Sequence, residues 1–331
     1  GLAYGVVLGA FMHMLIQVPG VFTLGYKYRL HINLRHPALK RMAVLMIPRT
    51  LGIGVAQINS IVNTAIASTL AVGSVAVFRW ADNLQSLPIG IFGVSFAVAI
   101  FPTLAEKYTL QKLAEFKDDF VRVLRQILFL IIPTMVLYWL LRAQIVRLVL
   151  GAGQFGWEDT RFTISVLAFM TFGMAAQATI PLLARSFYAL QDTKTPLITS
   201  LIGLVVNVGL AFALIQNLHV VGLAAALSIA GLINMALLLV MLARRLRGLP
   251  WGGIGLVTAK IGAASLIMGG VGYAILRVAN LIVGTHTFWG LFTQTAITGV
   301  VAVFTYLALA TIFKIPEVKI MLAPAKLFRR G

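Results

Sequence analysis

Four polar residues fall on one face of a predicted membrane-spanning helix, and they are the first candidates for chemistry in this sequence. In the run FRWADNLQSLP, Arg79, Asp82, Asn83 and Ser86 are spaced at i, i+3, i+4 and i+7. Ionisable groups in lipid cost several kcal/mol unless they face a cavity or a partner. The pattern therefore predicts a cavity wall that contacts a polar or anionic headgroup, with Arg79 paired to Asp82 when the cavity is empty. A second interpretation is that Arg79 reaches the interface and Asp82 only neutralises it.

A second polar face is expected on the preceding apolar stretch. Gln57, Asn59 and Asn63 recur there at helical spacing, beside Ser60 and Thr64. These residues either line the same cavity or hydrogen-bond between helices, where each bond contributes ~0.6–2 kcal/mol. Both interpretations stay open.

Single polar residues in other apolar stretches are weaker candidates. Arg185, in RSFYAL, either binds a phosphate or follows the charge bias of membrane proteins. Isolated amides favour helix packing over ligand binding, and they are Gln177, Asn207 and Asn234.

A hinge is predicted directly after the first polar face. Proline removes a backbone hydrogen bond inside a helix, and glycine permits close approach of a neighbouring helix. Pro88, Gly90 and Gly93 follow one another there, so the middle of this helix is expected to bend.

Catalysis of the soluble type has little support. The chain has no cysteine, five scattered histidines and nine acids, of which only Asp82 lies within a predicted span. Neither a metal site nor a general acid and base pair can be assembled from the spans. We expect no cofactor, no metal and no enzyme activity, although Glu158 and Asp159 in an outer loop leave that question open.

The elements that position these residues are long apolar helices. The chain has 331 residues, 60% of them hydrophobic, and a mean hydropathy of +0.96, so lipid must be its solvent. About nine stretches are long enough to cross ~30 Å of hydrocarbon at ~1.5 Å per residue. The predicted fold class is therefore an all-α polytopic transmembrane helix bundle, with spans near 2–25, 44–71, 73–104, 120–141, 162–190, 196–216, 219–243, 255–279 and 288–313.

The net charge of +18 is mostly a signal of topology. Every lysine and most arginines fall in the segments after the first, third, fifth, seventh and ninth spans, or in the span ends beside them. By the positive-inside rule that side is cytoplasmic, so the C-terminus is expected inside and residue 1 outside. We therefore expect membrane lipids, and no nucleic acid, as partners.

Composition also suggests how the chain is divided. Residues 106–119 are charged with both signs and predict a surface helix. The expected parts are a first span at 1–25, a cytoplasmic amphipathic linker at 26–43, a six-helix bundle at 44–243, a helix pair at 244–313 and a basic cytoplasmic tail at 314–331. Because the chain starts with Gly1 and runs straight into a span on the outside, we expect it to be a fragment.

Four stretches resemble the MurJ/MviN-type lipid II flippases of the multidrug/oligosaccharidyl-lipid/polysaccharide exporter superfamily. They span most of residues 48–239 and occur in the family's order. They are PRTLGIGVAQINSIVNTAIASTLAVGSVAVFRWADNLQSLPIGIFGVSFAVAIFPTLAE (48–106), LGAGQFGWEDT (150–160), LLARSFYALQDTKTP (182–196) and VGLAAALSIAGLINMALLL (221–239).

The resemblance implies a fold and an activity. Members of the family have fourteen spans, in two lobes of six and a C-terminal pair that forms a groove for the lipid tail. This chain would match the last nine, with most of the arginines of the anion site in the absent lobe. The implied function is flipping of lipid II, an undecaprenyl-pyrophosphate-linked sugar peptide, by alternating access in the bacterial inner membrane. A monomer is expected.

Individual residues match the family only in part. Asp82 matches the acid of a cavity motif, whereas Asn83 and Ser86 replace its usual Arg and Glu, so Arg79 is expected to supply the missing cation. Some members use carboxylates for sodium at the positions of Asn63 and Ala211, and this chain has neither. The resemblance therefore does not support a sodium site.

Other functions stay open at this stage. A related polysaccharide-lipid or multidrug exporter would share the fold, and a drug exporter would favour aromatic residues and an acid in the cavity. A membrane glycosyltransferase needs an acidic loop, and a scaffold without transport does not need the polar face around Asp82.

Overall fold

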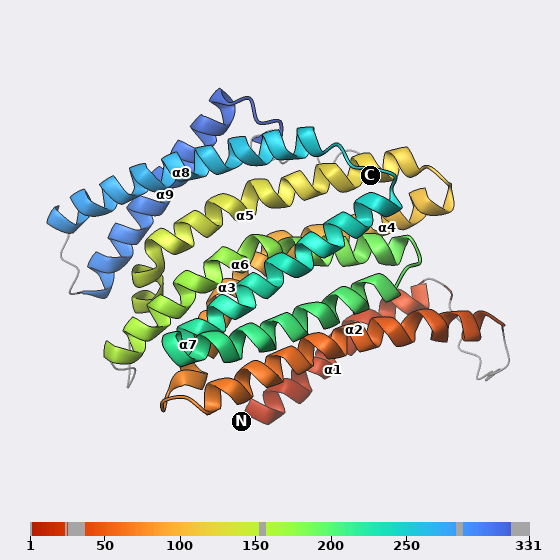
Figure 1. The fold of residues 1–331 in the computed structure, drawn as a ribbon, viewed down its shortest axis with the longest axis horizontal. Helices are drawn as coiled ribbons and strands as arrows, with labels where there is room; N and C mark the ends of the chain where they lie inside the picture. The colour runs from red at the N-terminus through yellow and green to blue at the C-terminus, as the bar shows by residue number, and fades with distance from the viewer. Residues whose placement is uncertain (1, 24, 26–36, 152–156, 283–286, 319–331) are drawn as a thin grey trace. The chain divides into compact units, whose positions relative to one another are not determined.

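The computed structural model of the chain describes residues 2–23, 25, 37–151, 157–282 and 287–318, and these residues form helices and short turns with no strand (Figure 1). The elements are α1 (Leu2–Thr23), α2 (Pro37–Ser68), α3 (Ser74–Pro88), the π-helix η1 (Ile89–Val94), α4 (Ser95–Thr109), α5 (Leu113–Leu150), α6 (Trp157–Ala189), α7 (Lys194–Arg245), α8 (Trp251–Ile282) and α9 (Phe288–Ile312). The predicted all-α class is confirmed.

The chain divides into two compact units, Gly1–Val44 and Leu45–Gly331. The first unit holds α1 and the first turns of α2, and the second holds all the other elements. Of the expected linker, residues 26–36 lie outside the described part of the chain, and 37–43 are the first turns of α2. Most of the expected basic tail, residues 319–331, also lies outside it.

The described helices account for the nine predicted spans. Eight helical stretches are long and apolar enough to cross a membrane, and one of them joins α3, η1 and α4. Helix α7 has 52 residues, which at ~1.5 Å per residue is more than twice the ~30 Å of hydrocarbon. Its backbone breaks at His219, where φ is 50° and ψ is −134°. Helix α7 is therefore two spans joined at one residue, close to where the sequence predicts a turn.

The prediction of a separate surface helix at residues 106–119 is wrong, because the segment is divided between α4 and α5. Helix α4 continues to Thr109, and α5 begins at Leu113 after a short turn. Phe116 and Phe120 of α5 are fully buried, so the end of this segment packs into the bundle, whereas residues 109–115 are exposed. The spacing of the two phenylalanines at i and i+4 forms an apolar face that outweighs the surrounding charges.

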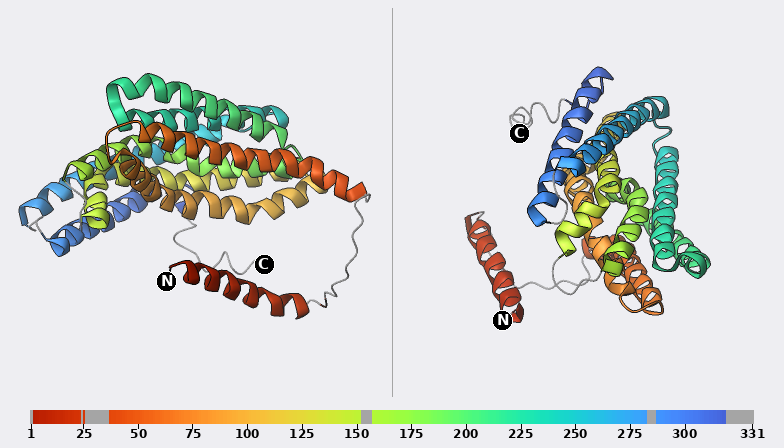
Figure 2. Two further views of the ribbon diagram at one scale, coloured as in Figure 1. Left: turned by 90° about the horizontal axis from the view of Figure 1, so that it is seen from below. Right: turned by 90° about the vertical axis from the view of Figure 1, so that its left-hand side faces the viewer.

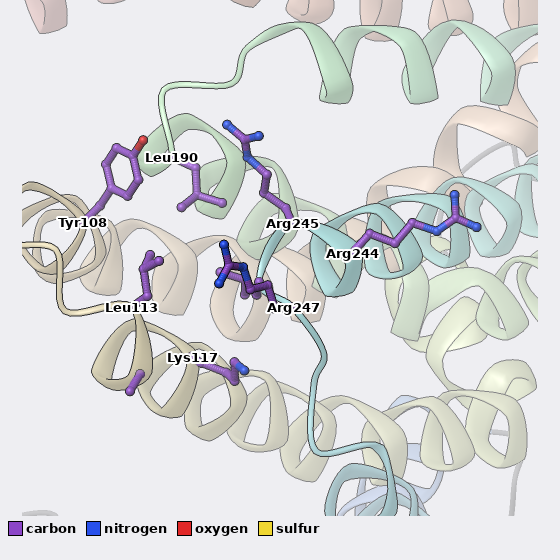
Figure 3. Close-up of a pocket in the computed structure, with 9 residues that line it drawn as sticks. Tyr108, Leu113, Lys117, Leu190, Arg244, Arg245 and Arg247 are labelled. Atoms are coloured by element: carbon purple, nitrogen blue, oxygen red, sulfur yellow. The ribbon is translucent and has the colours of Figure 1, made fainter.

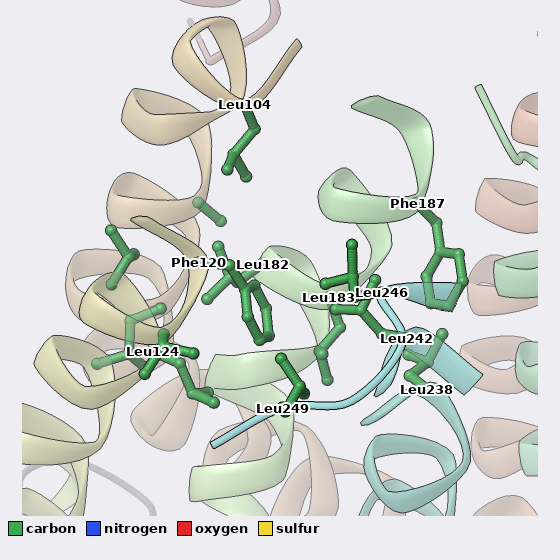
Figure 4. Close-up of a cluster of buried hydrophobic side chains, with 14 of the residues drawn as sticks. Leu104, Phe120, Leu124, Leu182, Leu183, Phe187, Leu238, Leu242, Leu246 and Leu249 are labelled. Carbon is green, nitrogen blue, oxygen red and sulfur yellow. The ribbon is translucent and has the colours of Figure 1, made fainter. Parts of the chain in front are cut away.

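The main core lies around α6. Helix α6 contacts α3, α4, α5 and α7, and the views of Figures 1 and 2 show it among these helices. Figure 4 shows one buried cluster, in which Leu104 of α4, Phe120 of α5, Leu182 of α6 and Leu242 of α7 meet. Buried contacts of this kind fix the ends of these helices, where several cations lie.

The last two helices form a hairpin on the side of α5. Helices α8 and α9 contact each other and α5. Phe129 of α5 and Ile261 of α8 pack with Tyr306 of α9, whose hydroxyl donates a hydrogen bond to the carbonyl of Phe129 at 2.7 Å. The hairpin is therefore anchored to the bundle by both apolar packing and a buried polar contact.

Candidate functional site

The predicted polar face, which we call the polar stripe, comprises Arg79, Asp82, Asn83 and Ser86 and lies on α3. Helix α3 follows a tight turn that ends at Gly73, where φ is 92°, a left-handed conformation that glycine adopts without strain. The turn brings α3 back beside the end of α2.

Arg79 of the stripe reaches α2. Its Nη1 donates a hydrogen bond to Ser60 Oγ at 3.1 Å, although the arginine side chain is exposed. Ser60 lies on the second polar face that the sequence predicts. The two polar faces therefore adjoin each other at this end of the bundle.

Asp82 does not pair with Arg79. Its Oδ1 accepts a hydrogen bond from Gln85 Nε2 at 3.0 Å, and within the described residues no ion pair joins it to Arg79. Sequence reasoning missed Gln85, which is buried and has no partner for its Oε1 in the described part of the chain. Its position three residues after Asp82, beside the polar stripe, is the signal that identifies it.

The remaining residues of the stripe are exposed. The hydroxyl of Ser86 donates to the carbonyl of Asn83 at 2.8 Å, a bond within the helix, and both side chains are accessible. Exposed polar side chains on a membrane-spanning helix require water or a polar ligand beside them.

Two of the predicted cavity residues on α2 are engaged in a helix contact. Asn207 of α7 donates from Nδ2 to Asn59 Oδ1 at 2.7 Å and to Asn63 Oδ1 at 2.8 Å. Asn63 and Asn207 are buried, and Asn207 Oδ1 lacks a partner among the described residues. These three residues, the amide cluster, link α2 to α7, and the packing role expected for Asn207 is what the structure shows.

Gln57 and Arg185 stand apart from this arrangement. Gln57 is exposed on α2. Arg185 lies four residues before the end of α6, where its Nη1 donates to the carbonyl of Pro181 at 3.4 Å. Phe78 of α3 packs in one buried cluster with Leu167 of α6, and Gly93 of η1 packs against Ala178, so the two helices run in the same direction. Arg185, seven residues after Ala178, therefore lies toward the opposite end of the bundle from Arg79. The structure does not bring the two arginines together.

The segment predicted as a hinge contains a π-helix. Helix η1 begins directly after Pro88, and the backbone N–H of Ser95 donates to the carbonyl of Gly90 five residues earlier. A proline lacks the N–H of a regular turn, which explains a change of hydrogen-bond register at this point. A Cβ added to Gly93 would lie 2.5 Å from the carbonyl oxygen of Ala178, whereas Gly90 has nothing within 4 Å. Gly93 therefore permits close contact with α6.

Comparison with known proteins decides the family. The model of the family described as lipid II flippase MurJ matches residues 1–293. The chain belongs to the MurJ family. The probable lipid II flippase MurJ of Rhizobium tropici is 32% identical over 271 residues, which cover 82% of this chain and 50% of the relative. The probable MurJ of Vibrio cholerae is 33% identical over 239 residues, covering 72% and 45%. The family resemblance inferred from the four sequence motifs is confirmed.

Solved structures show the same fold. A MurJ structure described as an inward closed conformation matches with a TM-score of 0.67 and 26% identity, over 87% of this chain and 57% of that one. A MATE transporter in a bent conformation matches with a TM-score of 0.57 at 15% identity, covering 89% and 69%, which shows the fold alone. The chain spans about half the length of the curated MurJ relatives that it matches.

Proposed function

We propose that this chain forms the later part of a lipid II flippase, which moves the lipid-linked peptidoglycan precursor from the inner to the outer leaflet by alternating access. The observation that carries the proposal is the contact of Arg79 with Ser60, in a chain that belongs to the MurJ family. That contact supports a polar surface shared by α2 and α3, on which an anionic headgroup can be bound.

The polar stripe provides both recognition elements that such a headgroup requires. Arg79 is an exposed cation whose guanidinium can form two parallel hydrogen bonds to a phosphate. Asn83 and Ser86 are exposed hydrogen-bonding groups on the same face, suited to sugar hydroxyls. Residues Pro88, Gly90 and Gly93 would let α3 move relative to α4, because η1 already departs from regular α-helical bonding.

An apolar hollow of about 500 Å³ supports a place for the lipid tail. It lies between α5, α6 and α8 and is lined by residues such as Trp139, Phe172 and Tyr273. Apolar side chains of this kind suit an isoprenoid chain and exclude its charged headgroup. The hollow and the polar stripe would then hold the two chemically different ends of one substrate.

The finer features of the proposal follow from charge and sequence. The positive-inside rule supports a cytoplasmic C-terminus, and it accounts for most of the excess cations without nucleic-acid binding. The chain acts as a monomer without enzyme activity. Asn63 and Asn207 bond to each other and Ala211 is apolar, so coupling by the membrane potential or by protons is favoured over sodium.

Substitution of the stripe within a full-length MurJ protein tests this function. Arg79→Ala and Asp82→Ala should each abolish colony formation in a strain depleted of its own lipid II flippase, because the headgroup loses a cation for its phosphates and a carboxylate acceptor for its sugar hydroxyls. Immunoblots of isolated membranes should show unchanged protein levels.

Arg161→Ala is the matched control, because Arg161 is also an exposed arginine near the start of a membrane-spanning helix but is not part of the stripe. It should support normal growth. Normal growth of the Arg79 and Asp82 variants would refute the proposed role of the stripe.

A further inference from the structure

A basic pocket lies at the end of the bundle opposite the polar stripe. It has a volume of about 740 Å³ and is formed where four helices begin or end (Figure 3). Its lining residues come from the end of α4, the start of α5, the residue after α6 and the end of α7, and they are Tyr108, Leu113, Ala114, Lys117, Leu190, Arg244, Arg245, Leu246 and Arg247. Four of these residues are cations and none is an acid.

Three neighbouring cations have acidic partners. Lys107 and Arg122 pair with the buried Asp119, and Lys107 and Lys112 pair with Glu115 at 3.5 and 3.3 Å. We call these five residues the ion-pair cluster. By contrast, none of the ion pairs and hydrogen bonds among the described side chains involves Lys117, Arg244, Arg245 or Arg247.

The charge bias of membrane proteins does not explain this difference. The positive-inside rule requires cations on one side of the membrane but not their convergence on a hollow without a counter-ion. Like charges close together repel one another, so three arginines within four residues raise the energy of the empty site. An anion in the pocket would remove that repulsion.

The end of α7 fixes how the arginines are presented. The N–H of Gly248 donates to the carbonyl of Ala243 at 2.8 Å, and Arg247 has a φ of 55°, so the helix ends in a Schellman turn. The same left-handed conformation occurs at Gln111, Gln191 and Lys314, so the backbone strain alone does not indicate a ligand. The turn instead sets the directions in which the arginine side chains leave the end of α7. Figure 3 shows Arg245 extending toward Leu190 and Arg247 toward Leu113, whereas Arg244 extends away from them.

We propose that the basic pocket binds a phosphate-bearing anion at the membrane surface. Arg245 and Arg247 would supply forked donors that match phosphate oxygens, Lys117 would supply a third cation, and the Tyr108 hydroxyl would donate at the rim. Leu113, Leu190 and Leu246 give the pocket apolar walls, which suit the first methylenes of the acyl chains beside a lipid headgroup. The site is separate from the polar stripe, so it does not depend on the proposed transport function.

Two probes distinguish the sources of the phosphate. The first is dihexanoyl phosphatidylglycerol, with dihexanoyl phosphatidylcholine as the neutral comparison, added to the chain in a non-ionic detergent and counted by native mass spectrometry. The second is inorganic pyrophosphate, measured by isothermal titration calorimetry. Preferential binding of the anionic lipid alone assigns the pocket to a lipid headgroup, and binding of pyrophosphate alone or of both assigns it to phosphate in general.

The variant Arg245→Gln/Arg247→Gln should weaken binding of whichever probe binds about 25-fold, because each cation contributes roughly fivefold. The matched control is Lys194→Gln/Lys314→Gln, which removes two exposed charges from the same predicted side of the membrane but none from the pocket. The control should bind as the unchanged chain does, and circular dichroism should be the same for all three proteins. Equal losses in both double variants, or no binding of either probe by the unchanged chain, would overturn the proposal.

Discussion

The ion-pair cluster and the polar stripe each contain an aspartate and an arginine three residues apart on one helix, but the two side chains form an ion pair only in the cluster. Asp119 and Arg122 are three residues apart on α5 and form an ion pair. Arg79 and Asp82 are three residues apart on α3 and do not, since they bond to Ser60 and Gln85. An acid on the N-terminal side of a base is the more favourable order on a helix, and only α5 has it.

Burial adds to the effect of order. The Asp119 side chain is 4% exposed and has a second partner in Lys107 of α4, so its charge is compensated from two helices. The residues of the stripe are exposed or half-buried, and within the described part of the chain one hydrogen bond, from Arg79 to Ser60, joins them to another helix. The ion-pair cluster therefore stabilises the fold, whereas the stripe keeps its charges available to a ligand.

The largest expected effect comes from opening the ion-pair cluster. Asp119→Ala should lower the free energy of unfolding by about 3 kcal/mol, because Lys107, only 21% exposed, would lose its buried partner. Thermal unfolding of the detergent-solubilised chain, followed by circular dichroism, measures the change. Asp118→Ala is the control, since Asp118 is exposed, and it should stay within about 0.5 kcal/mol of the unchanged chain. Equal effects of both substitutions would contradict the contrast between the two regions.

The amide cluster should show an intermediate effect. Asn207→Ala removes the donor to both Asn59 and Asn63 and should cost about 1–2 kcal/mol, because interhelical hydrogen bonds in membranes are individually weak. The same unfolding measurement applies. Asn234→Ala removes an amide for which the described residues provide no hydrogen bond, so its cost should be smaller. A larger cost at Asn234 than at Asn207 would show that the cluster does not join α2 to α7 in the folded chain.

Hydropathy predicted the spans well because the thickness of the hydrocarbon sets their length. The break in α7 was expected near residues 216 to 219 and occurs at His219. The prediction for residues 106–119 fails because charge density indicates a surface segment, whereas apolar periodicity determines how the start of α5 packs. Phe116, Phe120 and Leu124 recur every four residues and are buried, a pattern that indicated a packed helix from the start.

The contacts between helices could not be read from the sequence in the same way. The polar stripe was predicted from its spacing, but its partners depend on how neighbouring helices are placed. Pro88 predicted a bend but not a π-helix, because the register of the bonds depends on which carbonyls find donors. The basic pocket was hidden for a similar reason, since its cations come from separate helix ends and meet only in the folded chain.

The smallest effect on stability is expected from the stripe itself. Asp82→Asn keeps an oxygen that can accept the hydrogen bond from Gln85, so the free energy of unfolding should change by less than about 0.5 kcal/mol. It removes the negative charge beside Arg79, and growth of a flippase-depleted strain should therefore fail if that charge takes part in headgroup recognition. Unfolding and growth are measured on the same variant, in the isolated chain and in a full-length MurJ protein respectively. Loss of stability comparable to that of Asp119→Ala would show that Asp82 is a structural charge like Asp119, and the two regions would then differ only in position.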